Sequence, residues 1–415
     1  MRLNQRILRS GIVVWLVGSV VGSWCTIQSW AVGSDGVVGA FANLLWVVSL
    51  PGWATAYALH GFGIGGGRSD PGSIIIASTM GWGYLVVGGC VLWMVRGLLA
   101  GKRRAIERDL GEETETVNTS RRAFVANSTF GGVAVVAASG PGYATLVEPW
   151  SIKVREYSVP IRDLPASLDG LRIVQVSDTH LGPRIPKSFV ERAYRMAVDL
   201  KPDLIVLTGD HVHDGTKEIE RAAALCEPLV RACPMGVLGV LGNHDWWGDG
   251  PGLSVMLSEV GVRMIDNDRV WIDANTRRIV DREPAEASLA IAGIGDLTDG
   301  VIDLDAAFEG IGERTARVVL AHNPDTAEID GLASEGGDRV DLMLSGHTHG
   351  GQVRIPILGT PIVPSRFGQK YAGGLVDGPR FRVLISRGVG MSMLPVRVGV
   401  PPEIGVITLT RWSGG

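Results

Sequence analysis

Residues 171–180 read LRIVQVSDTH, a short apolar run that ends in the polar residues Asp178 and His180. The same pattern recurs in two later runs, LIVLTGD (204–210) and GVLGVLGNHD (236–245). Amphipathic stretches near 187–200 and 216–232 separate the three runs and have the spacing of helices. Near-continuous apolar strands with helices between them are typical of a sheet covered on both faces, so we predict a soluble α/β domain from residue 151 onward.

Five more β-rich runs follow in the second half of the chain. They are LAIAGIG (289–295), RVVLA (317–321), DLMLS (341–345), FRVLIS (381–386) and IGVITL (404–409). Two of them also end in histidines, because His322 follows RVVLA, and His347 and His349 follow DLMLS. In open α/β sheets, ligands bind at the carboxyl ends of the strands. We therefore expect the polar residues at five strand ends to face one region.

The residue types at these strand ends favour a metal site. Five of the eight histidines lie there, together with two aspartates and an asparagine. So many unpaired polar groups are costly to bury, and a bound metal removes that cost. Imidazole and carboxylate ligands without thiolate suit Mn, Fe or Zn. The polar residues in question are Asp178, His180, Asp210, Asn243, His244, His322, His347 and His349.

The motifs, taken in order, resemble the calcineurin-like metallophosphoesterase superfamily. The resemblance covers about residues 171 to 355 and rests on Asp178-x-His180, Gly209-Asp210, Gly242-Asn243-His244-Asp245, His322 and Gly346-His347-x-His349. Later motifs are similar to the membrane-associated YkuE- and YaeI-like branch and to some UDP-2,3-diacylglucosamine pyrophosphatases of lipid A synthesis. Those motifs are His349-Gly350-Gly351-Gln352-Val353-Arg354, Tyr371-Ala372-Gly373-Gly374 and Leu394-Pro395-Val396-Arg397.

The resemblance implies a sandwich of two mixed sheets flanked by helices and a centre of two divalent metal ions. One ion would take Asp178, His180 and His349 as ligands. The other would take Asn243, His322 and His347, and Asp210 would bridge the two. In such centres the ions activate a shared water as hydroxide and neutralise the charge that develops on the phosphate.

The resemblance also implies catalytic roles for His244 and Asp245. His244 would protonate the leaving oxygen or stabilise the phosphoryl group, and Asp245 would orient His244. The chain departs from the family pattern after the bridging aspartate, where it reads His211-Val212-His213-Asp214-Gly215. His211 and His213 could reach a substrate phosphate, and the alternative is two solvated loop histidines.

Charged residues and cysteines narrow the classes of function. The net charge of -4 gives no support for a nucleic-acid-binding protein.

Cys226 and Cys233 are seven residues apart in an expected helix and its end, too far for a disulfide, so we predict free buried thiols. Four arginines are candidates for gripping a phosphate bidentately, and Arg397 is favoured among them. They are Arg354, Arg366, Arg387 and Arg397.

The chain before residue 150 has a different character. Three charge-free apolar runs cover 11–32, 37–59 and 73–95, and each is long enough to cross a bilayer as a helix. We therefore predict transmembrane helices and a basic loop over 1–122, with buried soluble helices as the alternative. Residues 123–150 are either a further apolar helix or a twin-arginine-like signal anchor preceded by Arg121 and Arg122.

The side of the membrane follows from the basic residues. Seven arginines and lysines crowd the loop 96–122, and such an excess marks the cytoplasmic side. If 123–147 spans the membrane, the catalytic half lies on the extracytoplasmic side. The membrane would then be a bacterial-type inner membrane. The basic residues near the N-terminus also favour a cytoplasmic position, but three spans would put them on the opposite side from the basic loop. The number of spans and the N-terminal orientation therefore stay open.

These observations predict a membrane-anchored hydrolase that cleaves a phosphodiester or pyrophosphate bond, on a lipid-linked substrate. A UDP-2,3-diacylglucosamine pyrophosphatase is one alternative, but its substrate would be met at the cytoplasmic face. A non-catalytic metal-binding membrane sensor is another, although no expected ligand is missing. A protein phosphatase is disfavoured because that group reads Asn-His-Glu where this chain has Asn243-His244-Asp245.

Overall fold

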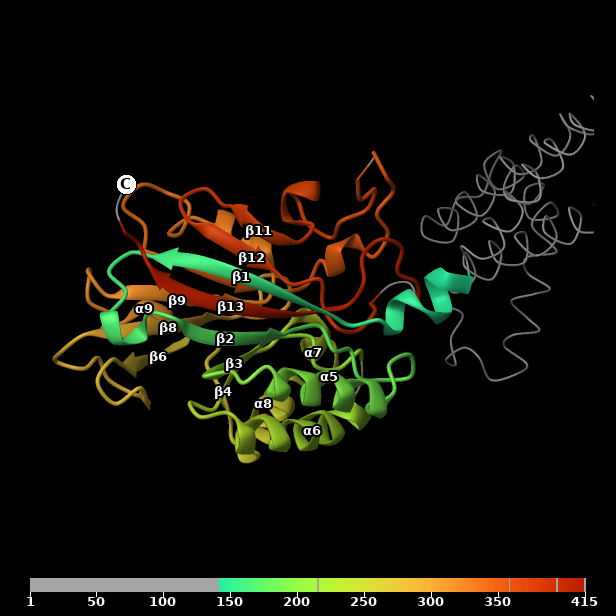
Figure 1. The fold of residues 1–415 in the computed structure, drawn as a ribbon, viewed down its shortest axis with the longest axis horizontal. Helices are drawn as coiled ribbons and strands as arrows, with labels where there is room; N and C mark the ends of the chain where they lie inside the picture. Colours follow the sequence, from blue (N-terminus) through green and yellow to red (C-terminus); the bar gives the residue numbers. More distant parts are fainter. Residues whose placement is uncertain (1–141, 215, 358, 393–394, 414–415) are drawn as a thin grey trace, which may run out of the picture. The chain divides into compact units, whose positions relative to one another are not determined.

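The computed structural model describes residues 142–415 except 215, 358, 393–394 and 414–415 (Figure 1). The apolar runs 11–32, 37–59 and 73–95 and the arginine pair at 121–122 lie outside the described residues, as does most of the run 123–147. Within the described part of the chain, no helix is long and apolar enough to cross a bilayer. The division of the chain at residues 122 and 150 stays a prediction.

The first sheet has six strands in the order β1-β13-β2-β3-β4-β5. Their bounds are β1 Lys153–Ile161, β13 Glu403–Arg411, β2 Leu171–Val176, β3 Leu204–Thr208, β4 Val237–Val240 and β5 Val262–Met264. The strands from β2 to β5 are parallel, and β13 is antiparallel to β2. Helices fill the connections of the parallel strands: α5 Lys187–Asp199, η3 Thr216–Glu218, α6 Ile219–Ala232, α7 Asn243–Gly248 and α8 Gly250–Glu259.

The second sheet has seven strands in the order β11-β12-β10-β9-β8-β6-β7. Their bounds are β11 Gly374–Asp377, β12 Arg382–Ile385, β10 Leu342–Ser345, β9 Ala316–Ala321, β8 Ser288–Ile294, β6 Asp268–Asp273 and β7 Ile279–Val280. The four central strands are parallel, and the strands at both edges are antiparallel. Short helices complete the domain: η1 Glu148–Trp150, η2 Ala166–Leu168, α9 Leu304–Phe308, η4 Pro324–Glu328, η5 His349–Gly351 and η6 Gly368–Tyr371.

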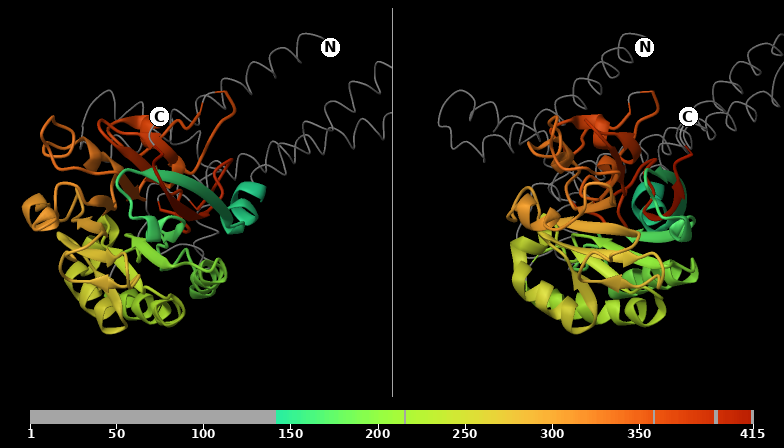
Figure 2. Two further views of the ribbon diagram at one scale, coloured as in Figure 1. Left: turned by 60° about the vertical axis from the view of Figure 1, so that its left-hand side comes forward. Right: turned by 90° about the vertical axis from the view of Figure 1, so that its left-hand side faces the viewer.

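The two sheets pack face to face, and each is covered on its other face (Figure 2). The layer between the sheets includes Ile173 and Val206 from the first sheet and Val318 and Leu344 from the second. Helices α5 and α6 cover the outer face of the first sheet, where Phe189, Ala193 and Leu225 belong to a separate core. Because both faces of the central strands are buried, their sequences read as continuous apolar runs. The prediction of an α/β fold with two mixed sheets is confirmed.

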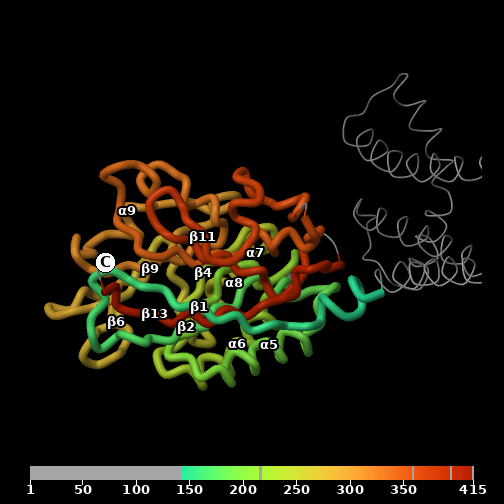
Figure 3. The backbone as a smooth tube through the Cα atoms, turned by 45° about the horizontal axis from the view of Figure 1, so that its top comes forward, coloured from blue at the N-terminus to red at the C-terminus, as the bar shows by residue number. Residues whose placement is uncertain are grey.

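The structure contains strands that the sequence analysis did not predict. All eight expected runs fall on strands, and the additional strands are β1, β5, β6, β7 and β11. The longest of them, β1, pairs with β13 along nine residues, and the two run side by side in Figure 3. Residues 153–156 at its start are exposed, so this edge strand lacks the apolar signal of a central one. Cys226 and Cys233 are buried and free, as predicted.

Candidate metal centre

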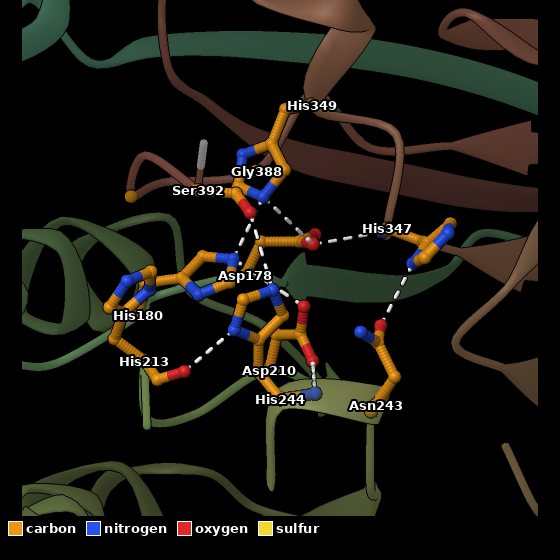
Figure 4. Close-up of polar contacts among 12 residues, drawn as sticks. Asp178, His180, Asp210, His213, Asn243, His244, His347, His349, Gly388 and Ser392 are labelled. Atoms are coloured by element: carbon orange, nitrogen blue, oxygen red, sulfur yellow. Dashed lines mark hydrogen bonds and ion pairs between the residues drawn. The ribbon is translucent and has the colours of Figure 1, made fainter. Parts of the chain in front are cut away.

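The candidate ligands follow five strands, three in the first sheet and two in the second. Asp178 and His180 follow β2, Asp210 follows β3, Asn243 begins α7 after β4, His322 follows β9, and His347 and His349 follow β10. The structure brings all seven side chains into one region (Figure 4 draws six of them with labels). The site therefore lies where the carboxyl ends of the parallel strands of both sheets meet.

The main chain turns sharply at five of the seven candidate ligands. Asp178, His180, Asp210, His347 and His349 have φ values of 54°, 47°, 53°, 70° and 50°. This left-handed region costs an L-residue roughly 1–2 kcal/mol. Such strain persists only where the surrounding structure imposes it, and it concentrates at functional sites. Each turn aims a side chain at the site directly after its strand ends.

Four donor groups form the first cluster. Single ligand atoms of Asp178, His180, Asp210 and His349 all lie within 4.8 Å of one another, and all four residues are buried. The Nε2 atoms of His180 and His349 are 2.8 Å apart. His349 Nε2 lies 3.4 Å from Asp178 Oδ1, and His180 Nε2 lies 3.4 Å from Asp210 Oδ2. Two imidazole nitrogens and two carboxylates thus converge on one point.

The second cluster consists of Asp210, His322 and His347, again with donor atoms within 4.8 Å. His322 Nε2 lies 3.2 Å from Asp210 Oδ2. Asn243 joins this group, because its Oδ1 is 3.0 Å from His347 Nδ1. Asp210 belongs to both clusters, which is the arrangement that a carboxylate bridging two cations requires.

Burial fixes the charge of the ligands in a way that favours a cation. Burial lowers the pKa of His347 to about 3 and the pKa values of His180 and His349 well below their usual range. These rings are neutral, so their lone pairs are free to bind a metal. Burial raises the pKa of Asp178 to about 7. The charge of His322 offsets this effect only in part, and a divalent ion would favour the ionised carboxylate further.

Asp210 and His322 form a buried ion pair at the centre of the site. Burial alone would lower the pKa of His322, but the Asp210 carboxylate raises it well above its usual range. Burial likewise opposes ionisation of Asp210, yet His322 and His180 hold its pKa well below the ordinary value. A proton on His322 thus balances the shared carboxylate. A divalent cation can take the place of that proton, so the donor set fits the expected metals.

Gly209, directly before Asp210, offers a test of how tightly the site is packed. Its φ is +88°, and an added Cβ would lie 2.6 Å from His322 Nδ1. That nitrogen lies 2.7 Å from the Thr208 carbonyl oxygen, a contact that orients the ring. We expect Gly209→Ala to displace His322 and to lower kcat/KM for a phosphodiester about 10²-fold, as misplacement by about 1 Å does in active sites.

The matched control for this substitution is Gly236→Ala. Gly236 has a φ of +89° but nothing within 4 Å of an added Cβ. Both variants should lose about 1 kcal/mol of stability from the left-handed backbone, measured by urea denaturation. Gly209→Ala should lose more than this, because its Cβ would also lie 2.7 Å from the backbone nitrogen of Gly242. Only Gly209→Ala should lose activity. Equal kinetics in the two variants would mean that His322 tolerates displacement.

His244 lies beside the first cluster. Its backbone N–H donates to Asp210 Oδ1 at 2.9 Å, and its ring packs edge-on against His180 with centroids 4.6 Å apart. Nδ1 lies 2.6 Å from the carbonyl oxygen of His213, and Nε2 lies 3.3 Å from Ser392 Oγ. The exposed ring of Trp247 packs 4.0 Å from the His244 ring. Ser392 and Trp247 were not predicted, because no spacing or strand end marks them.

The expected role of Asp245 is wrong, because this carboxylate does not contact His244. Its Oδ1 accepts hydrogen bonds from the backbone of His211 and Val212 at 2.8 and 3.1 Å, and its Oδ2 accepts one from Gly242 at 2.9 Å. The physical reason is the helix that begins at Asn243. Successive side chains on a helix point about 100° apart, so Asp245 faces the turn after Asp210 instead of His244. The carbonyl of His213 takes the orienting position.

His211 and His213, which follow Asp210, are not solvated loop residues, and their surroundings differ. His211 is buried, and its Nδ1 lies 3.0 Å from Asp245 Oδ2. The His213 ring is half-buried and stacks on His244 at 5.2 Å. Donor atoms of His180, His213 and His244 lie within 4.8 Å of one another. His213 therefore flanks the site, and His211 contacts Asp245 instead.

The prediction that Arg397 grips a phosphate is also wrong. Arg397 is fully buried, and its guanidinium donates to the carbonyls of Arg387, Gly388, Gly390 and Val400. Its Nη2 lies 3.4 Å from Nδ1 of His349. The other three candidates are distributed elsewhere: Arg387 pairs with Glu403, and Arg354 and Arg366 are exposed.

Comparison with known proteins gives consistent matches. Residues 171–351 match the family model for calcineurin-like phosphoesterases. The chain is 32% identical over 295 residues to the uncharacterized metallophosphoesterase YkuE of Bacillus subtilis, covering 70% of this chain and 97% of YkuE. It is 30% identical to the phosphodiesterase YaeI of Escherichia coli, covering 70% and 99%. A Danio rerio transmembrane protein with a metallophosphoesterase domain is 29% identical, and the match covers 62% of this chain and 57% of that protein.

Proposed function

Because the chain belongs to the calcineurin-like metallophosphoesterase family, we propose that it hydrolyses phosphodiester or pyrophosphate bonds at a centre of two divalent metal ions. The observation that carries the proposal is the Asp210 carboxylate, which two clusters of buried donors share. Asp178, His180 and His349 would hold one ion, and Asn243, His322 and His347 would hold the other. Asp210 would bridge the pair.

Two ions held there would lower the pKa of a water molecule between them and neutralise charge on the phosphate oxygens. The protein must then deliver a proton to the leaving oxygen. His244 suits this role, because the His213 carbonyl accepts a hydrogen bond from Nδ1 and orients the ring. The opposite nitrogen, Nε2, is then the atom that carries the transferable proton, at the Ser392 side of the site.

We also propose that the enzyme is anchored in a membrane and acts on a lipid-linked substrate. The support is the block of apolar runs before residue 150 and the name of the Danio rerio relative, which describes that protein as transmembrane. The basic loop at 96–122 supports a catalytic domain on the extracytoplasmic side, on the condition that 123–147 spans the membrane. A lipid-linked phosphoester on that side would reach the centre without crossing the bilayer.

The direct test uses the purified full-length chain in detergent. With Mn²⁺, it should hydrolyse bis(p-nitrophenyl) phosphate, and a chelator should reduce the rate to the uncatalysed level. Adding Mn²⁺ back should restore activity, and metal analysis should find bound ions at the same step. Hydrolysis that persists after the chelator has removed the ions would refute a metal-dependent centre.

A further inference from the structure

The segment 355–362, which we call the apolar loop, contains three exposed isoleucines, whereas its Thr360 is buried. Ile357 is fully exposed, Ile362 is 65% exposed and Ile355 is 40% exposed. Two backbone hydrogen bonds between Ile355 and Gly359, at 2.8 and 2.9 Å, close its first half into a tight turn. The loop therefore has a defined shape that presents branched apolar side chains to its surroundings.

The base of the apolar loop lies beside the start of the described domain. Arg354 N donates to Val398 O, and Val398 N donates to Gln352 O, both at 2.8 Å. Further along the same segment, Arg397 N donates to Ala144 O at 2.9 Å. Hydrogen bonds through residues 397 and 398 thus link the base of the loop to Ala144, near the end of the apolar run 123–147. Figure 1 shows the teal start of the domain and the orange-red loop toward the same side.

Exposed apolar side chains continue at the start of the domain. Leu146 is 75% exposed and Val147 is 47% exposed. Both lie within two residues of Glu148, whose carboxylate accepts from Val400 N at 2.7 Å. The same end of the domain therefore carries two groups of exposed apolar residues, held together by the segment 397–400. Single exposed apolar residues are ordinary, and it is the number of them at one end of the domain that points to a contact surface.

The charges around the apolar loop match a lipid surface. Residues 351–376 contain three basic residues and no aspartate or glutamate. Arg354 and Arg366 flank the loop and are exposed, while Lys370 pairs with Glu328 at 2.6 Å. An apolar centre with cations at its margin is the pattern of elements that lie in the interface of an anionic bilayer.

We propose that the apolar loop inserts into the surface of the membrane that anchors the chain, an inference that rests on the membrane anchoring proposed above. Both ends of the loop lie at the metal centre. On one side, Gln352 follows His349 by three residues and accepts from Ser392 N at 3.0 Å. On the other, the backbone of Pro364 lies near the His347 ring and raises its pKa slightly against the effect of burial. Insertion therefore presents the centre to phosphoesters at the level of the lipid headgroups.

The test places a fluorescent probe on the loop in the full-length chain. Ile357→Cys, labelled with an environment-sensitive dye, is reconstituted into vesicles of phosphatidylcholine and phosphatidylglycerol in equal parts. Lipids with spin-labelled acyl chains should quench this dye at least about twofold more than a dye at Val255→Cys. Val255 is the matched control, because it is 58% exposed on α8 and apolar. The parent protein, labelled in parallel, gives the background from native cysteines.

A second measurement separates this inference from the proposed function. The double variant Ile357→Asp, Ile362→Asp should hydrolyse soluble bis(p-nitrophenyl) phosphate at the parent rate but a vesicle-borne hexadecyl p-nitrophenyl phosphate about tenfold more slowly. Quenching at 357 no stronger than at 255 overturns membrane insertion and leaves a protein partner as the occupant. Quenching without hydrolysis of either substrate supports insertion and refutes the proposed function instead.

Discussion

Asp210→Asn should lower kcat/KM for bis(p-nitrophenyl) phosphate by about 10³-fold or more, which corresponds to about 4 kcal/mol of lost transition-state stabilisation. Asp210 Oδ2 lies 3.4 Å from His180 Nε2 and 3.2 Å from His322 Nε2, so one carboxylate serves both donor clusters. Asparagine retains the size of the side chain and one oxygen for the His244 backbone N–H. It removes the negative charge that two cations would share. Metal analysis of the purified variant should therefore find fewer ions per chain than in the parent.

The control for this variant is Asp266→Asn. Asp266 is half-buried, and desolvation of its carboxyl group raises its pKa to about 6. Its Oδ1 accepts from Leu241 N at 2.9 Å, a bond that an amide oxygen can keep. Asp266 belongs to neither donor cluster, so kcat/KM should change by less than about threefold. If Asp210→Asn and Asp266→Asn lose activity equally, the loss reflects a buried charge near the sheets, and the bridging role of Asp210 has to be abandoned.

The strand ends explain how much of the site could be predicted from the sequence. A buried parallel strand has an unmistakable apolar run, and the residue that follows it lies at a known edge of the sheet. For this reason Asp178, Asp210 and His322 were expected in one region, and their side chains do meet there. The sequence does not show the backbone turn at each position, such as the φ of 70° at His347, because a single residue carries no signal for it.

Supporting contacts could not be predicted, because they join residues that are distant in sequence. Asp245 stands next to His244 in the chain, yet it bonds to the turn at His211. Its neighbours depend on the rotation of α7, which the order of residues does not reveal. β1 was missed for a related reason. It is stabilised by pairing with β13, about 250 residues later in the chain, and has little apolar pattern of its own.

The contacts of Arg397 could not be predicted from the sequence either, and replacing this residue should have the second large effect. As an arginine near the end of a motif, it resembled a phosphate clamp, but its two terminal nitrogens donate to four backbone carbonyls. Burial lowers its pKa to about 10, so the guanidinium remains charged at neutral pH. This charge lies against the loop 387–390, and a Cβ on Gly388 would lie 2.7 Å from Asp178 Cβ and 3.1 Å from His349 Nδ1. Arg397 thus fixes the loop 387–390, which packs against Asp178 and His349 of the first donor cluster.

We expect Arg397→Met to lower the free energy of unfolding by about 3 kcal/mol, because it leaves several buried carbonyls without a donor. For a domain of this size, the Tm should fall by roughly 10 °C. Metal affinity should also fall about tenfold or more, because His349 loses the group beside its Nδ1. Arg397→Lys keeps the charge but not the planar fork, so it should recover only part of either property.

The outcome is decided by comparing stability with metal binding in the same samples. Arg354→Met removes an exposed arginine from a nearby segment and should leave both Tm and metal affinity close to the parent values. If Arg397→Met melts early but binds metal with parental affinity, the residue stabilises the fold without positioning His349. If neither property changes, the carbonyls of Gly388 and Gly390 do not depend on this guanidinium, and the loop that closes the first donor cluster must be held by Arg387 and its pair with Glu403.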